Sequence, residues 1–166
     1  LARLAERALP SPCPCIAMRP CKLTMTAFAS FRTTQEVDFA AFEGATLLLI
    51  HGVTGAGKSS ILDAICFALY GSPADPERKS VDLRCNRAPL ELLTRVELEF
   101  VLGSRRYRVM REPEQERSKK KGSGTTRHAS DATIWELDAT GRPTLLTSGA
   151  SKVSDYVTAL LGFEVE

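Results

Sequence analysis

The stretch that decides the fold is Gly52-Val53-Thr54-Gly55-Ala56-Gly57-Lys58-Ser59, which matches the pattern G-x-x-x-x-G-K-[ST] at every fixed position. Glycines let successive backbone N–H groups point inward at polyanionic oxygens, and the start of a helix adds the positive end of its dipole. The pattern therefore predicts a phosphate-binding loop. In such a loop Lys58 places its ammonium on the β- and γ-phosphates, and the Ser59 hydroxyl ligates Mg²⁺. Ser60 is expected to add a phosphate hydrogen bond.

The segments on either side of the loop predict a strand and a helix. Residues 46–50 are continuously apolar, as in a strand that is covered on both faces of a parallel or mixed sheet. Residues 58–70 carry apolar side chains at helical spacing and end at Gly71-Ser72-Pro73. Strand, loop and helix in this order indicate an α/β P-loop NTPase fold.

The rest of the chain predicts mostly β-structure. Alternation of apolar and polar residues predicts strands at 22–27, 96–102, 107–109 and 133–137, and a short one at 37–39. The polar residues 112–130 predict a mobile loop. A single apolar stripe predicts a final helix over residues 153–161, with Ser151 as its cap and Gly162 as its stop.

Length and composition predict one soluble domain. The chain has 166 residues, 43% hydrophobic and 25% charged, and no apolar run approaches the roughly 18 residues of a membrane span. We expect no membrane partner and a cytoplasmic protein with reduced thiols. Residues 1–17 are expected to be a disordered or upstream extension, and residues 18–166 the folded domain. A zinc site at Cys13, Cys15 and Cys21 is the alternative for the cysteines, but a fourth ligand is missing.

The positive charge is concentrated in residues 105–127, which hold nine basic and three acidic residues. Five of these basic side chains are candidate contacts to DNA phosphates: Arg106, Arg108, Lys119, Lys120 and Lys121. The alternative is a solvated loop, because lysine-rich loops are common on inert surfaces.

The segments 22–28, 37–39 and 49–71 together resemble the N-terminal half of an ABC ATPase head, and the SbcC exonuclease subunit family in particular. The resemblance continues through residues 96–100, 106–109 and 114–117, and so spans residues 18–166. It implies the N-terminal lobe of an ABC-type head, with a mixed sheet and flanking helices. It also implies nucleotide contacts by Ser30, which lies beside Ala29 where relatives carry an arginine.

The resemblance implies a larger assembly than this chain. The full-length protein would be a homodimeric, nucleoid-associated ATPase of double-strand-break repair that binds ATP, Mg²⁺ and double-stranded DNA and regulates an SbcD-like nuclease. Its own C-terminal half-head is missing here, and the Q-loop glutamine is expected just after residue 164. We therefore expect this fragment to bind nucleotide without turnover.

Two further interpretations remain open. A different P-loop ATPase, such as an ABC transporter subunit or a small-molecule kinase, is the alternative for the whole chain. Near the loop, Asp63 is either a catalytic carboxylate or a polar residue on the outer face of its helix, and the second is favoured. His51 either senses phosphate charge or fills a place beside the loop. Trp135 and Phe100 are expected to pack rather than to stack on bases.

Overall fold

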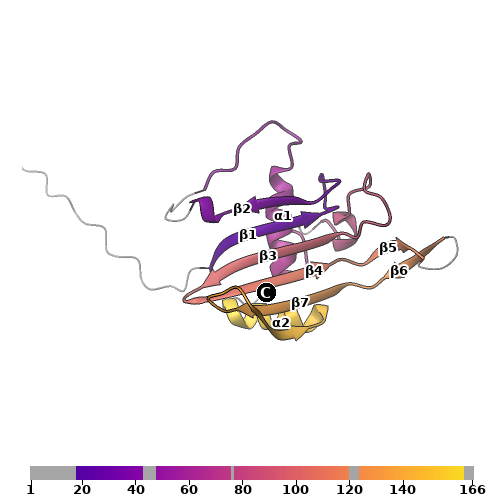
Figure 1. Ribbon diagram of the computed structural model, residues 1–166. Helices are drawn as coiled ribbons and strands as arrows, with labels where there is room; N and C mark the ends of the chain where they lie inside the picture. The colour runs from indigo at the N-terminus through magenta and orange to yellow at the C-terminus, as the bar shows by residue number, and fades with distance from the viewer. Residues whose placement is uncertain (1–17, 43–47, 76, 120–123, 163–166) are drawn as a thin grey trace, which may run out of the picture.

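One antiparallel sheet organises the protein. The computed structural model describes residues 18–42, 48–75, 77–119 and 124–162. Within them, six strands pair in the order β2-β1-β3-β4-β7-β8, and β5 and β6 form a separate two-stranded ribbon (Figure 1). The strands are β1 Met18–Thr26, β2 Gln35–Asp38, β3 Arg95–Leu102, β4 Arg105–Glu112, β5 Gln115–Ser118, β6 Thr125–His128, β7 Asp131–Leu137 and β8 Pro143–Ser148. Every one of these pairs is antiparallel.

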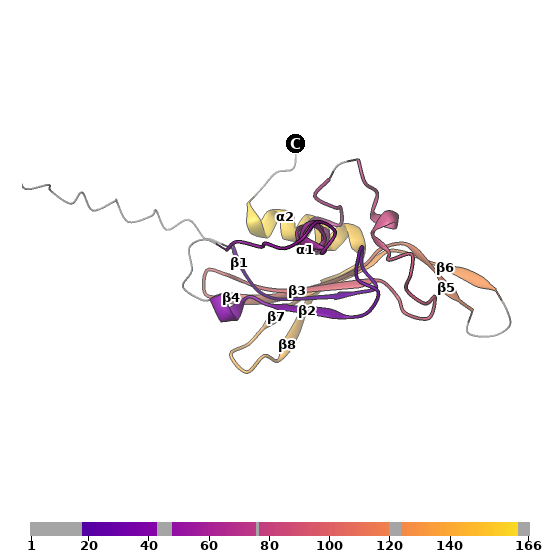
Figure 2. The same cartoon turned by 90° about the horizontal axis from the view of Figure 1, so that it is seen from above.

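Two helices cover one face of the six-stranded sheet. α1 Lys58–Tyr70 and α2 Ala150–Leu161 lie on the same side, and the short 3-10 helices are η1 Ala40–Phe42 and η2 Ser80–Leu83 (Figure 2). The alternation predicted for the strands is confirmed, because Leu23, Leu98 and Val109 face the helices and are fully buried. Phe67 of α1 packs near Phe28, with ring centroids 6.1 Å apart. This layer of strands and helices forms the core.

The predictions for α1 and for the strands at 22–27, 37–39, 96–102, 107–109 and 133–137 are confirmed to within a few residues. The predicted final helix is also present as α2, and it ends at Gly162, which has a φ of 70°. Its predicted cap is wrong. The N-cap residue is Gly149, no side chain caps the helix, and Ser151 lies inside the first turn.

The buried strand predicted at residues 46–50 is wrong for its described part. Residues 48–50 have no regular secondary structure, and Leu49 is 78% exposed. A buried strand needs neighbours for its backbone groups, and the described sheet places none beside this segment. The parallel pairing expected of a mixed sheet is accordingly not found among the described strands.

The mobile loop predicted at residues 112–130 is also wrong in its described part. Gln115–Ser118 and Thr125–His128 pair as β5 and β6, and this ribbon projects from the end of the sheet (Figure 1). Strand β8 was not predicted, because residues 143–148 begin with a proline and lack strict alternation. Within the described residues, no helix has both the length and the apolar character needed to cross a bilayer.

Candidate nucleotide-binding site

The site lies at the N-terminal end of helix α1. Gly57 is the N-cap residue, with φ 87° and ψ 14°, and no side chain caps the helix. No acidic residue occupies its first turn. The first N–H groups of an α-helix have no partner within the helix, and they carry the positive end of the helix dipole. The sequence thus leaves this helix start open to an anion.

A hollow of about 280 Å³ lies over the helix start. It is lined by Ser30, Thr54, Gly55, Gly57, Lys58, Ser59 and Ser60. The ammonium of Lys58 turns back into the loop, where it donates to the carbonyl oxygens of Gly52 at 2.9 Å and Val53 at 2.8 Å. The structure therefore brings together the predicted residues of the motif, with the lysine held by the backbone of its own loop.

The turn after β1 supports the loop from one side. The Ser30 and Ser60 hydroxyl oxygens are 3.1 Å apart and share a hydrogen bond. A Cβ atom added to Gly57 would lie 2.6 Å from Cζ of Phe31 and 2.8 Å from Oγ of Ser30. Any larger residue would have to displace these side-chain atoms, and the positive φ also favours glycine. Ser30, a predicted nucleotide contact, lies next to the loop, and the packing of Phe31 against Gly57 was not predicted.

Backbone strain accompanies this turn. Ala27 and Ala29 both have φ of 48°, a conformation that alanine rarely adopts. The turn is held by Ala29 N–H, which donates to Leu83 O at 2.6 Å, and by Thr94 Oγ1, which donates to Ala27 O at 3.0 Å. Strained residues cluster at functional sites, where the surrounding structure holds them in place. Here the strained residues immediately precede Ser30 and Phe31, which lie beside Gly57 and Ser60 at the start of α1.

Asp63 does not lie on an outer face. Its side chain is 6% exposed, it accepts a hydrogen bond from Ala74 N–H at 3.2 Å, and it forms an ion pair with Arg78. The preferred interpretation is therefore wrong in its placement, because Asp63 ties α1 to the segment that follows it. One turn along the same helix, burial raises the pKa of the Cys66 thiol, with a smaller contribution from Asp63. His51 is exposed beside the loop and does not fill a packed position.

The candidate DNA contacts lie away from the loop. Arg106 and Arg108 are on the face of the sheet opposite the helices, and both pair with Glu99, at 2.6 Å and 2.8 Å. Lys119 is exposed next to the β5–β6 ribbon. Lys120 and Lys121 lie outside the described residues, as do Cys13 and Cys15 of the zinc alternative. Residue 164, just after which the Q-loop glutamine was expected, also lies outside them.

Phe100 and Trp135 differ in their surroundings. Phe100 is fully buried and stacks on Tyr107, with ring centroids 5.4 Å apart, as expected for a packing residue. Trp135 is half-buried on the open face of the sheet, opposite Arg108 on one neighbouring strand and Leu145 on the other.

The sheet, its two helices and the loop at the start of α1 are consistent with an α/β domain of the P-loop kind, and comparison with known families agrees. Residues 22–142 match the family model described as "AAA domain", and the chain belongs to this family. Its more particular similarity is to the SbcC proteins of the nuclease SbcCD. Over 90% of its own length, this chain is 44% identical to the SbcC protein of Vibrio cholerae and 34% identical to that of Deinococcus radiodurans.

A third relative is the SbcC protein of Lactococcus lactis, which is 38% identical over 73% of this chain. The chain spans 15% of the length of the Vibrio and Deinococcus proteins and 11% of the Lactococcus protein. These matches confirm the predicted SbcC-type resemblance. They concern one small part of much longer proteins.

Proposed function

We propose that this chain is the ATP-binding part of an SbcC-like ATPase of DNA repair. The observation that carries the proposal is the glycine-rich loop at the start of α1, where Phe31 and Ser30 crowd position 57 and where the ammonium of Lys58 lies within the loop. The SbcC proteins that the chain matches support the same assignment.

The residues of the loop fit ATP with Mg²⁺. Lys58 would exchange its two carbonyl partners for phosphate oxygens, and the open N–H groups at the helix start would donate to the same polyanion. Ser59, exposed at the mouth of the hollow, would offer its hydroxyl to the metal ion. When bound, Mg²⁺ supplies neutralising charge to the phosphates. Ser30 and Ser60 hold the side wall through their shared hydrogen bond.

The described site favours binding over turnover. Hydrolysis requires a group that orients or activates water, usually a carboxylate or a glutamine. No carboxylate lies among the described residues that line the hollow, and Asp63 is committed to Arg78 and Ala74. We therefore propose that hydrolysis in the complete protein uses residues outside this chain, supplied by a second half-head and by a dimer partner.

A titration with labelled ATP and Mg²⁺ tests the proposal. Lys58→Ala removes one charge-assisted contact of roughly 1.5 to 3 kcal/mol, so affinity should fall about ten- to a hundredfold. The matched control is Lys152→Ala, an exposed lysine of α2 that does not line the hollow. Equal dissociation constants for the wild type and Lys58→Ala, with both proteins folded, would refute the phosphate role.

The partners are proposed from the same family. An SbcD-like nuclease is the expected protein partner, because the relatives carry the name of a two-component nuclease. Double-stranded DNA is the expected nucleic-acid partner, and two basic regions of this chain support DNA binding. One is the open face of the sheet, with Arg19, Arg106 and Arg108 near its β3–β4 turn. The other is the β5–β6 ribbon, with Arg117 on β5 and the exposed Lys119 just after this strand.

A further inference from the structure

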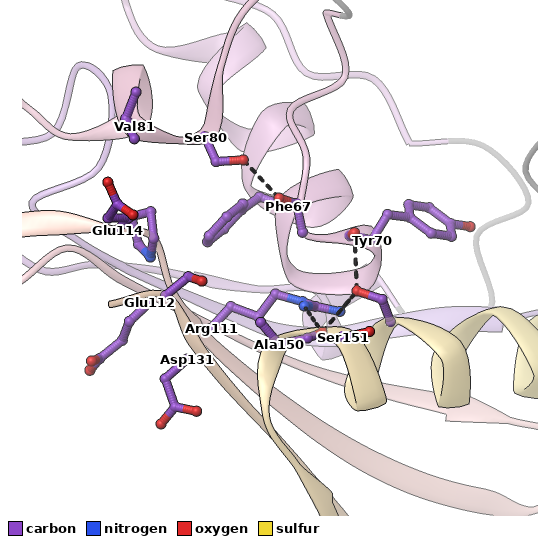
Figure 3. A pocket seen from close by; sticks show the side chains of 14 residues that line it. Phe67, Tyr70, Ser80, Val81, Arg111, Glu112, Glu114, Asp131, Ala150 and Ser151 are labelled. Atoms are coloured by element: carbon purple, nitrogen blue, oxygen red, sulfur yellow. Dashed lines mark hydrogen bonds between the residues drawn. The ribbon is translucent and has the colours of Figure 1, made fainter. Parts of the chain in front are cut away.

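A buried arginine joins the two helices. Arg111 of β4 is 2% exposed and points to the helix-covered side of the sheet. Its Nε donates to Ala68 O at 2.7 Å and its Nη2 donates to Leu69 O at 3.0 Å, so it holds the last turn of α1. The same guanidinium donates to Ala150 O at 3.2 Å and to Ser154 Oγ at 3.1 Å in the first turn of α2 (Figure 3).

The charge of Arg111 is matched by dipoles. Its four hydrogen-bond acceptors are three backbone carbonyls and a hydroxyl, with no carboxylate among them. The carbonyls of a helix C-terminus carry partial negative charge, and a cation there is favourable. Burial lowers the pKa of Arg111 to about 10, which leaves the guanidinium charged at neutral pH. A neutral side chain would leave the carbonyls of Ala68 and Leu69 without this donor.

The contact is made at the far end of the helix that begins at Lys58. α1 has 13 residues, so its two ends are about 18 Å apart, and a helix of this length moves largely as a rigid rod. The Ser154 hydroxyl accepts from Arg111 and has two acceptors within reach of its one proton, Ala150 O at 3.0 Å and Tyr70 O at 3.4 Å. Gly71, which ends α1, is close enough that an added Cβ would lie 3.2 Å from Nη1 of Arg111. The carbonyl groups of Ala68 and Leu69 in the last turn of α1 are therefore both held by one side chain, that of Arg111.

We propose that Arg111 is a positioning residue for the phosphate-binding loop, which it orients by clamping the last turn of α1 against the first turn of α2. This inference rests on the proposed ATP binding. Arg111 touches none of the residues that line the hollow over the helix start. Its effect on the affinity for ATP is transmitted through α1. The affinity for ATP therefore also depends on the position of α2.

The test compares two arginines of the full 166-residue chain. Arg108 also makes a forked pair, in which Nε and Nη2 donate to Oε1 of Glu99 at 3.0 Å and 2.8 Å, but it lies on the face of the sheet that α1 and α2 do not cover. Arg111→Lys and Arg108→Lys keep the charge and lose the forked geometry, and both should lower thermal stability. ATP affinity is measured at a temperature at which all samples are folded. Arg111→Lys should weaken it roughly three- to thirtyfold, and Arg108→Lys by less than about twofold.

The outcomes separate the two proposals. If the wild type fails to bind ATP, the proposed function is wrong and the inference falls with it. If the wild type binds and the two variants bind equally well, only the role of Arg111 is overturned. Should Arg111→Lys not fold, Ser154→Ala replaces it as the milder change, since it removes one of the four acceptors of the Arg111 guanidinium. It should weaken ATP binding about twofold, and an unchanged dissociation constant would count against the clamp.

Discussion

Gly55 and Gly57 have nearly the same backbone conformation but different surroundings. Their φ angles are 83° and 87°, yet an added Cβ meets nothing within 4 Å at Gly55 and meets Phe31 and Ser30 at Gly57. The two glycines therefore separate the cost of an unfavourable φ from the cost of crowding.

We expect Gly57→Ala to lower the free energy of unfolding by about 2 to 4 kcal/mol, because it adds crowding to the strain of a left-handed alanine. Gly55→Ala should cost only about 1 to 2 kcal/mol, from the backbone strain alone. Chemical denaturation of both variants gives the measurement. Equal losses at the two positions would mean that the turn carrying Phe31 yields without cost.

At the scale of single residues, the sequence predicted the loop because its chemistry is local. Gly57, Lys58 and Ser59 are adjacent in the chain, and their spacing alone indicates a phosphate site. Phe31 and Arg111 make contacts with residues far away in the sequence, so no local sequence pattern predicted these contacts. Arg111 did leave one signal, since it continues the alternation of Tyr107 and Val109 toward the core.

At the scale of elements, periodicity predicted the strands and helices that bury one face. The strand predicted at residues 46–50 was wrong in its described part, because a continuous apolar run indicates burial but does not indicate which neighbouring element provides it. The mobile loop predicted at residues 112–130 was wrong in its described part, because the β5–β6 ribbon pairs polar residues across its strands, such as Arg117 opposite Thr126. Hydrophobic alternation cannot detect such a ribbon.

Glu112 joins these elements at the end of β4. Its carboxylate pairs with Arg95 of β3 at 2.6 Å and with His128 of β6 at 2.7 Å. Burial acts to raise the pKa of Glu112, but the hydrogen bonds from Arg95 and His128 outweigh it, so the pKa lies below its ordinary value of 4.5. Asp131 of β7 is the cross-strand partner of Glu112. The ionised form of Glu112 is thus favoured by folding.

A carboxyl group whose pKa is lowered by folding stabilises the protein above its unfolded pKa and loses that effect as the pH falls through the folded pKa. Glu112→Gln should therefore cost about 1 to 3 kcal/mol at pH 7, and the difference from the wild type should shrink below pH 4.5. Glu97→Gln is the control, because Glu97 is half-exposed and its Oε1 lies 4.0 Å from Nη1 of Arg95, the arginine that also pairs with Glu112. It should change stability by less than about 1 kcal/mol. A difference for Glu112→Gln that did not vary with pH would exclude the ionised carboxylate as its source.

At the scale of the whole molecule, the basic side chains form two separate groups. Arg106 and Arg108 lie near the β3–β4 turn, and Lys119 follows β5, which continues the direction of β4 away from that turn (Figure 1). Lys119 is eleven positions after Arg108, which is at most about 36 Å of extended chain. One turn of duplex DNA is about 34 to 36 Å long. A duplex lying along β4 and β5 would present its phosphates to both groups.

The two groups differ in their free charge, and this predicts how each contributes to DNA binding. Arg106 and Arg108 share the carboxylate of Glu99, so this trio carries a net charge of one, whereas the three lysines at 119–121 carry three. If three to five phosphates are contacted, log affinity should fall against log salt with a slope of about −3 to −4.5. The slope should not depend on sequence, because phosphate contacts carry no base information.

Replacing Lys119, Lys120 and Lys121 together by glutamine should reduce that slope by up to about 3, and Arg106→Gln with Arg108→Gln by only about 1. Lys152→Gln, on the helix-covered side of the sheet, should leave it unchanged. Duplex titrations over a range of salt concentrations measure all three slopes. A lysine variant that matched the wild type in affinity and slope would reduce this loop to a solvated surface. A double arginine variant with the larger effect would show that Glu99 releases both guanidinium groups when DNA binds.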